Sequence, residues 1–184
     1  MGKYEICLQK RNLRRTNILI MIFVALGTWD MPFTRPLIEI ENAVKDGIIK
    51  EQVIVQSGKT DYNSRYMKLV PFFDQEELQK HYEEASLIIC QAGVGSIMLG
   101  LKKRKKVIAI ARLKKNHEHI DDHQTEILHV FSVNNYILPW QGEGDLKNIL
   151  QNISSFNAVS YPFHEEKISD AIIDYLNNTF KKKR

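Results

Sequence analysis

The stretch Leu87-Ile-Ile-Cys-Gln-Ala-Gly-Val-Gly-Ser-Ile97 decides the fold of this chain. An apolar run leads directly into Gly93-Val-Gly-Ser96, where a pattern typical of a helix begins. Small residues at a strand-to-helix turn let the phosphates of a ligand approach backbone N–H groups at the positive end of the helix. In α/β proteins, nucleotides bind at the edge of the sheet where such turns lie. The stretch therefore predicts a parallel sheet with a phosphate-binding turn.

Apolar runs alternate with helical patterns along the rest of the chain. We expect strands at 18–26, 52–56, 67–71, 86–90, 106–110 and 135–138. We expect helices at 34–46, 74–84, 95–103, 119–131, 143–153 and 165–180. This alternation is typical of the α/β class, here a Rossmann-like parallel sheet with helices on both faces.

Charge is concentrated at the two ends of the 184-residue chain. The net charge is +4, but residues 1–15 and the tail Lys181-Lys-Lys-Arg184 hold nine of the 26 basic residues and leave an acidic body. An acidic body is not expected to bind nucleic acid, whereas basic ends favour a membrane surface or a partner, or simply keep the ends in solvent. The two cysteines, Cys7 and Cys90, form no disulfide framework and favour a reducing, cytoplasmic compartment.

The longest apolar run, Asn17 to Leu26, is about half the length that a membrane-spanning helix needs. Its Ile and Val content favours a buried strand over a signal peptide, because Gly27-Thr-Trp-Asp30 is not a small-residue cleavage site. Residues 1–15 show no clear pattern, which leaves Met21 as an alternative natural start.

Three loops are expected to reach the same edge of the sheet: the glycine turn, the loop Glu118–Gln124 and Gly27-Thr28. In the glycine turn, the Ser96 hydroxyl suits a helix cap or a phosphate oxygen, and the Gly-Lys-Ser/Thr ending of a Walker loop is missing. Gly27-Thr28 follows the first expected strand and forms the second candidate loop. Trp29 next to it is suited to stack on a ring or to pack in a core or interface.

The segment His117-Glu-His-Ile-Asp-Asp-His-Gln124 is dense in polar groups. A helix that begins near Ile120 would place His119 and His123 on one face, as in some metal sites. No cysteine lies nearby and no metalloprotease pattern is present, so we expect no metal here. Two readings remain: side chains that bond the hydroxyls of a sugar, or a surface helix capped by Asp121 or Asp122.

From about Met21 to Leu176 the chain resembles the C-terminal, donor-binding half of family 28 glycosyltransferases. Within that family it is similar to the small subunits of split bacterial exopolysaccharide and capsule enzymes, and to the small subunit of the eukaryotic dolichol-linked UDP-GlcNAc transferase. The matching pieces are Val24-Ala-Leu-Gly-Thr28 with Phe33 and Arg35, Ala92-Gly-Val-Gly-Ser-Ile97, and Ala111-Arg-Leu-Lys-Lys115 followed by Glu118-His-Ile-Asp-Asp-His-Gln124.

The resemblance implies one half of a GT-B architecture. With the charge and helical patterns of the two ends, the chain is expected to comprise a basic N-terminal extension at 1–16, a UDP-sugar-binding Rossmann-like domain at 17–163, and a C-terminal amphipathic helix with a basic tail at 164–184. A membrane-anchored subunit would bind the acceptor, and the active site would be the cleft between the two subunits. The chain would then lie at the cytosolic face of the membrane through that partner.

The implied activity is an inverting, UDP-sugar-dependent hexosyl transfer with a β-1,4 linkage. The acceptor would be a lipid-diphosphate-linked sugar in exopolysaccharide or capsule biosynthesis, and no metal or cofactor is implied. The resemblance assigns donor binding to Gly27, Thr28, Gly93, Val94, Gly95, Ser96, Arg112, Glu118, His119, Asp122, His123 and Gln124. It identifies no general base, and His119 and Asp122 remain candidates for a catalytic role.

Two positions depart from the pattern of the family. Gln91 stands where relatives usually have histidine, and Leu99 stands where many larger relatives have a glutamate that binds the ribose. The small capsule-type subunits also tend to lack that glutamate, so Leu99 favours this subgroup. Gln91 favours the alternative of a non-catalytic nucleotide-sugar-binding or adaptor subunit. A UDP-sugar epimerase of similar architecture would need both halves in one chain.

Overall fold

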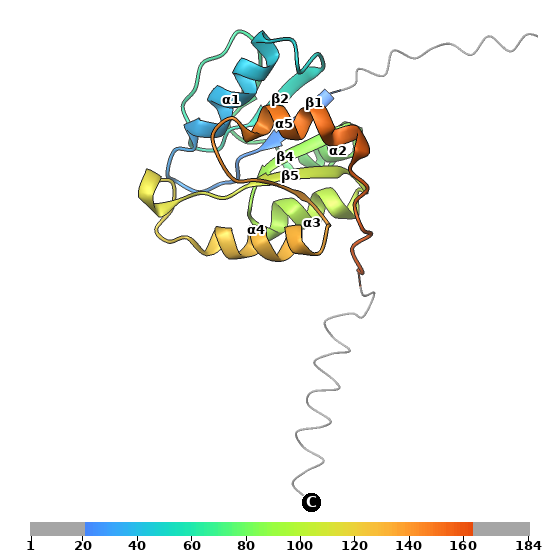
Figure 1. Ribbon diagram of the computed structural model, residues 1–184. Coiled ribbons are helices and arrows are strands. Elements are labelled where there is room, and N and C mark those ends of the chain that lie inside the picture. Colours follow the sequence, from blue (N-terminus) through green and yellow to red (C-terminus); the bar gives the residue numbers. More distant parts are fainter. Residues whose placement is uncertain (1–20, 164–184) are drawn as a thin grey trace, which may run out of the picture.

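The computed structural model describes residues 21–163, which form a parallel sheet between two layers of helices (Figure 1). The strands are β1 (Met21–Ala25), β2 (Gln52–Gln56), β3 (Lys68–Val70), β4 (Leu87–Gln91), β5 (Lys106–Ile110) and β6 (Leu138–Trp140). The α-helices are α1 (Thr34–Lys45), α2 (Gln75–Glu84), α3 (Val94–Lys102), α4 (His123–Val133) and α5 (Asp145–Asn152). Two short 3₁₀ helices, η1 (Lys114–Asn116) and η2 (Ile153–Ser155), complete the described part.

The strand order is β3-β2-β1-β4-β5-β6, and every neighbouring pair is parallel. The chain moves outward from β1 through β2 to β3, and then returns to the other side of β1 to continue through β4, β5 and β6. The order therefore reverses between β1 and β4. In open α/β sheets, the loops that leave the two strands at such a reversal diverge and leave a crevice for a ligand.

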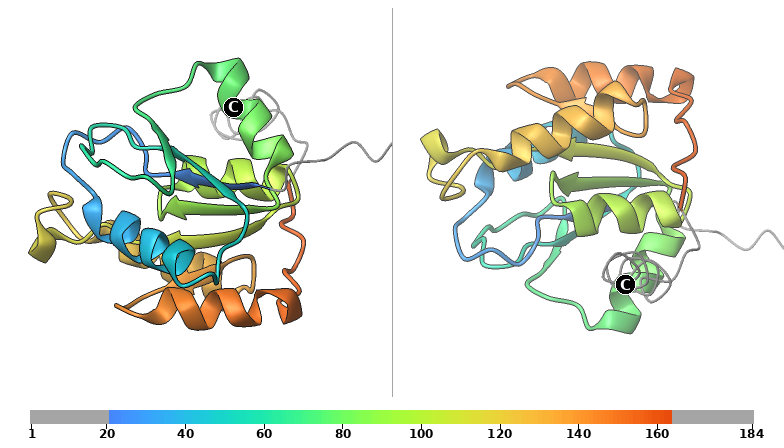
Figure 2. Two further views of the ribbon diagram at one scale, coloured as in Figure 1. Left: turned by 90° about the horizontal axis from the view of Figure 1, so that it is seen from above. Right: turned by 90° about the horizontal axis from the view of Figure 1, so that it is seen from below.

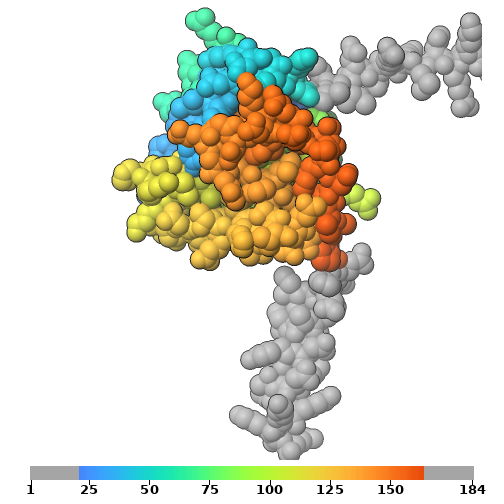
Figure 3. All heavy atoms as spheres, viewed as in Figure 1, coloured from blue at the N-terminus to red at the C-terminus, as the bar shows by residue number. Residues whose placement is uncertain are grey.

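Both faces of the sheet are buried, which explains the continuous apolar runs of its central strands. Along β4, Ile88 and Cys90 point into one hydrophobic core, and Leu87 and Ile89 point into the other. Helices α2, α3 and α4 cover the first face, and α1 and α5 cover the second (Figure 2). The space-filling view shows α5 in orange against α1 in blue (Figure 3). Burial raises the pKa of the Cys90 thiol, so this side chain acts as a small apolar residue.

The predicted fold class is confirmed, and two element positions are wrong. The last strand was expected at 135–138, but it occupies Leu138–Trp140. Asn135 has a φ of 57°, and the N–H of Tyr136 still bonds back to Phe131, so the chain is turning where the prediction began the strand. Helix α4 was expected from 119 but begins at His123. Residues 1–20 and 164–184, with the predicted extension, the start of the first strand and the 165–180 helix, lie outside the described part.

No helix between residues 21 and 163 has the length and apolar character needed to cross a membrane. Asn17–Leu26 was predicted to form a strand. Within the described part of this run, Met21–Ala25 form the strand β1.

A buried carboxylate fixes the loop between β2 and β3 to α1. Glu41 on α1 accepts hydrogen bonds from the Tyr62 hydroxyl and from Ser64 Oγ, the latter at 3.2 Å. Lys45 Nζ lies 3.5 Å from the same carboxylate. The hydrogen bond from Tyr62, with smaller contributions from Lys45 and Ser64, lowers the pKa of Glu41 below its usual value. This loop leads out of β2 and therefore supports the ligand edge of the sheet.

Changing Glu41 to glutamine is expected to lower the free energy of unfolding by about 1 kcal/mol at pH 7, because hydrogen bonds to a charged group are replaced by weaker ones. Since the pKa of Glu41 is lowered in the folded chain, its contribution is complete above the unfolded pKa and is lost as the pH falls through the folded pKa. Urea denaturation at pH 7, 5 and 3 should show the two proteins converging at low pH. Glu126→Gln on the exposed side of α4 is the control, and equal pH profiles for Glu41→Gln and the parent would contradict the assignment.

Candidate functional site

The glycine turn between β4 and α3 presents a row of backbone N–H groups. The first hydrogen bond of α3 runs from the N–H of Ile97 to the carbonyl of Gly93 at 3.1 Å. The N–H groups of Val94, Gly95 and Ser96 precede it, so they have no partner within the helix. They lie at the positive end of the helix dipole, where an anion is stabilised.

The side chains around this turn leave room for a ligand. A Cβ added to Gly95 would meet no atom within 4 Å, so this residue faces open space. Gly93 is the N-cap of α3, and no side chain caps the helix. The sequence left two roles open for the Ser96 hydroxyl, a helix cap or a phosphate contact. In the structure it does not cap α3, and it remains available to a ligand at the pocket wall.

A pocket of about 310 Å³ lies at the reversal point of the sheet. It brings together the loop after β1 and the loop after β4, whereas none of its lining residues comes from the predicted loop Glu118–Gln124. Its lining consists mainly of glycines and neutral polar groups, with apolar side chains of α2 and α3 at the rim. The lining residues are Ala25, Gly27, Thr28, Gln56, Leu78, Tyr82, Gln91, Gly93, Gly95, Ser96 and Leu99.

Gly27 and Gln91 join the two loops at close range. Gly27 has a φ of 80°, which L side chains rarely adopt. A Cβ on Gly27 would lie 2.0 Å from Nε2 of Gln91, so the loop after β1 passes directly over this amide. The other end of the amide, Oε1, accepts a hydrogen bond from Arg112 Nε at 2.8 Å. Gln91 thus connects this pocket to a buried arginine.

Arg112 binds the loops of three strands to one another. Its Nε bonds Gln91, and one terminal nitrogen donates to the carbonyl of Leu26 at 2.9 Å. The other terminal nitrogen donates to the carbonyls of Met31 at 2.7 Å and Glu118 at 3.1 Å. The residue is only 1% exposed, and burial lowers the pKa of its guanidinium to about 10, so it stays charged at neutral pH.

The other polar residues of the loop after β5 are also bound to the protein. Glu118 forms an ion pair with Arg35 at 2.9 Å and accepts the N–H of Leu113 at 2.9 Å. Gln124 Oε1 accepts the N–H of Arg112 at 3.1 Å. The sequence reading assigned Arg112, Glu118 and Gln124 to the donor, whereas the structure buries them and uses their polar groups to hold the loops in place.

The histidines of this loop gather around Asp121, and Trp29 packs against one of them. Trp29 stacks on His119 with ring centroids 4.6 Å apart, and His119 meets His123 edge-on at 4.8 Å. Asp121 Oδ1 lies 3.0 Å from His119 Nδ1 and also contacts His123 Nδ1. Asp122 instead accepts the N–H of Lys114 at 2.8 Å.

The expected helical face of His119 and His123 does not exist, because α4 begins only at His123. His117 closes η1 in a left-handed conformation, with a φ of 56°, and the following residues form a loop. The rings still meet because this loop folds back on itself around Asp121. Asp122 occupies the N-cap position of α4 but forms no side-chain cap bond.

Three pocket residues were missed at the sequence level. Gln56 had a usable signal, since it is a polar residue at the carboxyl end of the strand next to β1. Leu78 and Tyr82 gave no signal, because they lie on α2 and reach the pocket only through packing. Val94, which was predicted, is not among the lining residues.

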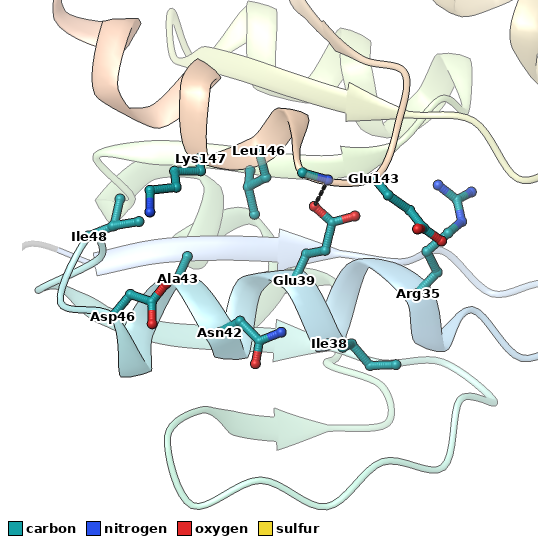
Figure 4. A pocket seen from close by; sticks show the side chains of 11 residues that line it. Arg35, Ile38, Glu39, Asn42, Ala43, Asp46, Ile48, Glu143, Leu146 and Lys147 are labelled. Carbon is teal, nitrogen blue, oxygen red and sulfur yellow. Dashed lines mark hydrogen bonds between the residues drawn. The ribbon is translucent and has the colours of Figure 1, made fainter.

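A larger cavity, about 460 Å³, lies between α1 and α5 (Figure 4). None of the predicted donor-binding residues lines it. Glu39 points into it and accepts the N–H of Gly144 at 3.1 Å, while burial raises the pKa of this carboxyl. The cavity lies between α1 and the start of α5 and not at the carboxyl ends of strands, where open α/β sheets bind nucleotides.

The glycosyltransferase family 28 C-terminal domain is the family whose model matches this sequence, over residues 21–170. The chain belongs to this family. No curated protein matches it significantly. Among solved structures it is similar to the glycotransferase of kitacinnamycin, with a TM-score of 0.53, 14% identity, and coverage of 84% of this chain and 39% of that one.

It is also similar to Acinetobacter baumannii MurG, with a TM-score of 0.50, 17% identity, and coverage of 74% of this chain and 40% of that one. The solution structure of ALG13 matches with a TM-score of 0.48 and 16% identity, and the match covers 85% of this chain and 94% of ALG13. The chain thus spans about two fifths of the two larger proteins. The family match confirms the predicted relationship, and the structural likeness confirms the Rossmann-like, GT-B-type fold.

Proposed function

We propose that this chain is the donor-binding subunit of a glycosyltransferase and holds a UDP-sugar at the reversal point of its sheet. The observation that carries the proposal is the pocket shared by the loops after β1 and β4, with Gly95 and Ser96 on its wall. Membership of family 28 supports sugar transfer as the reaction class. The pocket volume is within the lower range of small-molecule sites, which suits the diphosphate and part of the nucleoside or sugar.

In this proposal the diphosphate lies on the glycine turn. The N–H groups of Val94, Gly95 and Ser96 and the Ser96 hydroxyl bind its oxygens. When the bond from the anomeric carbon to UDP breaks, negative charge develops on the leaving phosphate. Fixed N–H dipoles at a helix N-terminus stabilise that charge without a metal or cofactor. Gly27 and Thr28 line the opposite wall.

The finer assignment is an inverting transfer, β-1,4-linked, to a lipid-diphosphate-linked acceptor in exopolysaccharide or capsule biosynthesis. Inversion needs a general base beside the acceptor hydroxyl. We propose that a membrane-anchored partner subunit binds the acceptor, supplies this base and holds the chain at the cytosolic face of the membrane. Its support is membership of family 28 together with the resemblance to the small subunits of split enzymes at Gly93–Ser96 and Glu118–Gln124.

Replacing Gly95 with leucine is expected to weaken UDP binding at least about 100-fold, because the new side chain projects into the open space over the turn. Leucine is a better helix former than glycine, so the free energy of unfolding should stay equal or rise by about 1 kcal/mol. Isothermal calorimetry with UDP measures the first effect, and urea denaturation measures the second.

Gly95→Ala is the matched control, since a single methyl group enters the same open space and should cost only a few-fold in affinity. Unchanged UDP affinity in Gly95→Leu would refute the site. The alternative function, a non-catalytic nucleotide-sugar-binding or adaptor subunit, is favoured by Gln91. It predicts that UDP binds and that no UDP-sugar of a panel is transferred when the chain is co-expressed with its membrane partner.

A further inference from the structure

We propose that His119, Asp121 and His123 form a binding site for one divalent transition-metal ion of the zinc type. One ligand atom from each side chain lies within 4.8 Å of the other two. Both Nδ1 atoms approach the same carboxylate oxygen, Oδ1 of Asp121. The three ligand atoms are thus close enough together for a single ion to reach all of them.

The cluster is held in place by its surroundings. His119 is 7% exposed, and its ring is fixed between the indole of Trp29 and the ring of His123. Asp121 receives the N–H of His123 at 3.2 Å, which ties the carboxylate to the first turn of α4. Because His119 is buried and directed at Asp121, its Nδ1 cannot turn to solvent as a surface histidine does.

The donor set selects the class of ion. Two imidazole nitrogens and one carboxylate oxygen suit Zn²⁺, Co²⁺ or Ni²⁺, whereas Mg²⁺ and Ca²⁺ prefer oxygen alone. The side chains of Asp121 and His123 are about half exposed, at 53% and 48%. The site is therefore open on one side, and three protein ligands plus one open position is the pattern of accessible zinc sites.

The bound ion would order the segment between η1 and α4. His119 and Asp121 lie in this segment and His123 is the first residue of α4, and the stacking of Trp29 on His119 extends the effect of the ion to the loop after β1. This role is separate from the glycine turn that holds the diphosphate, so the proposed sugar transfer has no step at the ion. The proposal revises the expectation that this segment holds no metal, because that expectation rested on the lack of a nearby cysteine and of a metalloprotease pattern, whereas the structure brings His119, Asp121 and His123 together.

The test is calorimetric titration of ZnCl₂ into the full-length chain, without a histidine tag and after treatment with a chelator. The parent is expected to bind one equivalent. His119→Ala, His123→Ala and Asp121→Asn should each weaken binding by more than about 100-fold, since even changes to groups around the ligands cost about 10–100-fold. His117→Asn, which suits the left-handed backbone, and His129→Ala on α4 are controls that should bind zinc like the parent.

Tryptophan fluorescence gives a second readout, because His119 stacks on the partly exposed Trp29 while Trp140 is buried. Zinc should change the emission of the parent and leave that of His123→Ala unchanged, with circular dichroism showing that both are folded. The proposal is overturned if the parent shows no saturable binding, or if the three variants bind like the controls. Neither result depends on UDP, so the metal site and the donor site succeed or fail separately.

Discussion

Replacing Arg112 with methionine is expected to lower the free energy of unfolding by about 3–5 kcal/mol, the range measured when one partner of a buried charged network is removed. Methionine fills much of the same volume but offers no donor. The carbonyls of Leu26, Met31 and Glu118 and the side-chain oxygen of Gln91 all lose a charge-assisted hydrogen bond. Each buried acceptor that is left without a partner costs about 1–3 kcal/mol. Urea denaturation at neutral pH measures the change.

Arg35→Met is the matched control. Arg35 also bonds the loop after β5, through Glu118 and the carbonyl of Ala111, but its side chain is 18% exposed and water can replace it. Its loss is expected to cost about 1–2 kcal/mol. If Arg112→Met lowered the free energy of unfolding no more than Arg35→Met, Arg112 would not be the residue that joins the loops. A loss of UDP affinity with unchanged stability would instead assign Arg112 to the donor.

Arg112 also shows what the sequence leaves undetermined. An arginine at the end of a strand, among glycine-rich loops, has the same local pattern whether it faces a phosphate or lies beneath the loops. The difference lies in the carbonyls of Leu26 and Met31, more than 80 positions earlier in the chain, which turn toward its guanidinium. Periodicity reports which residues are buried in regular elements, but it carries no information about where distant backbone carbonyls point.

The regular elements were predictable because their signals are local. Alternating apolar runs and helical patterns are sufficient to predict the parallel sheet, and the glycine turn is sufficient to predict an open loop at its edge. The loop after β5 was less predictable. His117 has a left-handed backbone and the N–H of Lys114 donates to the Asp122 carboxylate, so α4 begins only at His123, and neither feature has a periodic signature.

Gly27→Ala is expected to lower the free energy of unfolding by about 2–4 kcal/mol and to weaken UDP binding. A left-handed backbone at alanine costs about 1–2 kcal/mol. The added Cβ would also lie 2.0 Å from Gln91 Nε2, so the amide must move and stretch its bond to Arg112. Denaturation in urea measures the first effect, and calorimetry with UDP measures the second.

A double-mutant cycle separates the two causes. Gln91→Ala removes the amide that the new Cβ meets, so in that background Gly27→Ala should cost only the strain of its backbone, about 1–2 kcal/mol. If Gly27→Ala lowered the free energy of unfolding equally with Gln91 and with alanine at position 91, the contact with Gln91 would contribute nothing to the destabilisation.

Gly58→Ala supplies the contrast, with a φ of 61° and a Cβ that would lie 2.4 Å from the carbonyl oxygen of Gly27. This neighbour is backbone, and no change at Gln91 gives it room. The cost of Gly58→Ala should therefore be the same with and without Gln91. Gln91→Ala is thus expected to reduce the stability cost of Gly27→Ala without reducing that of Gly58→Ala. This result would show that a movable side chain, Gln91, contacts the loop after β1 on one side and that fixed main chain contacts it on the other. In that case the side chain at position 91 sets the width of the proposed donor pocket. The replacement of the usual histidine by Gln91 would then change the shape of the pocket.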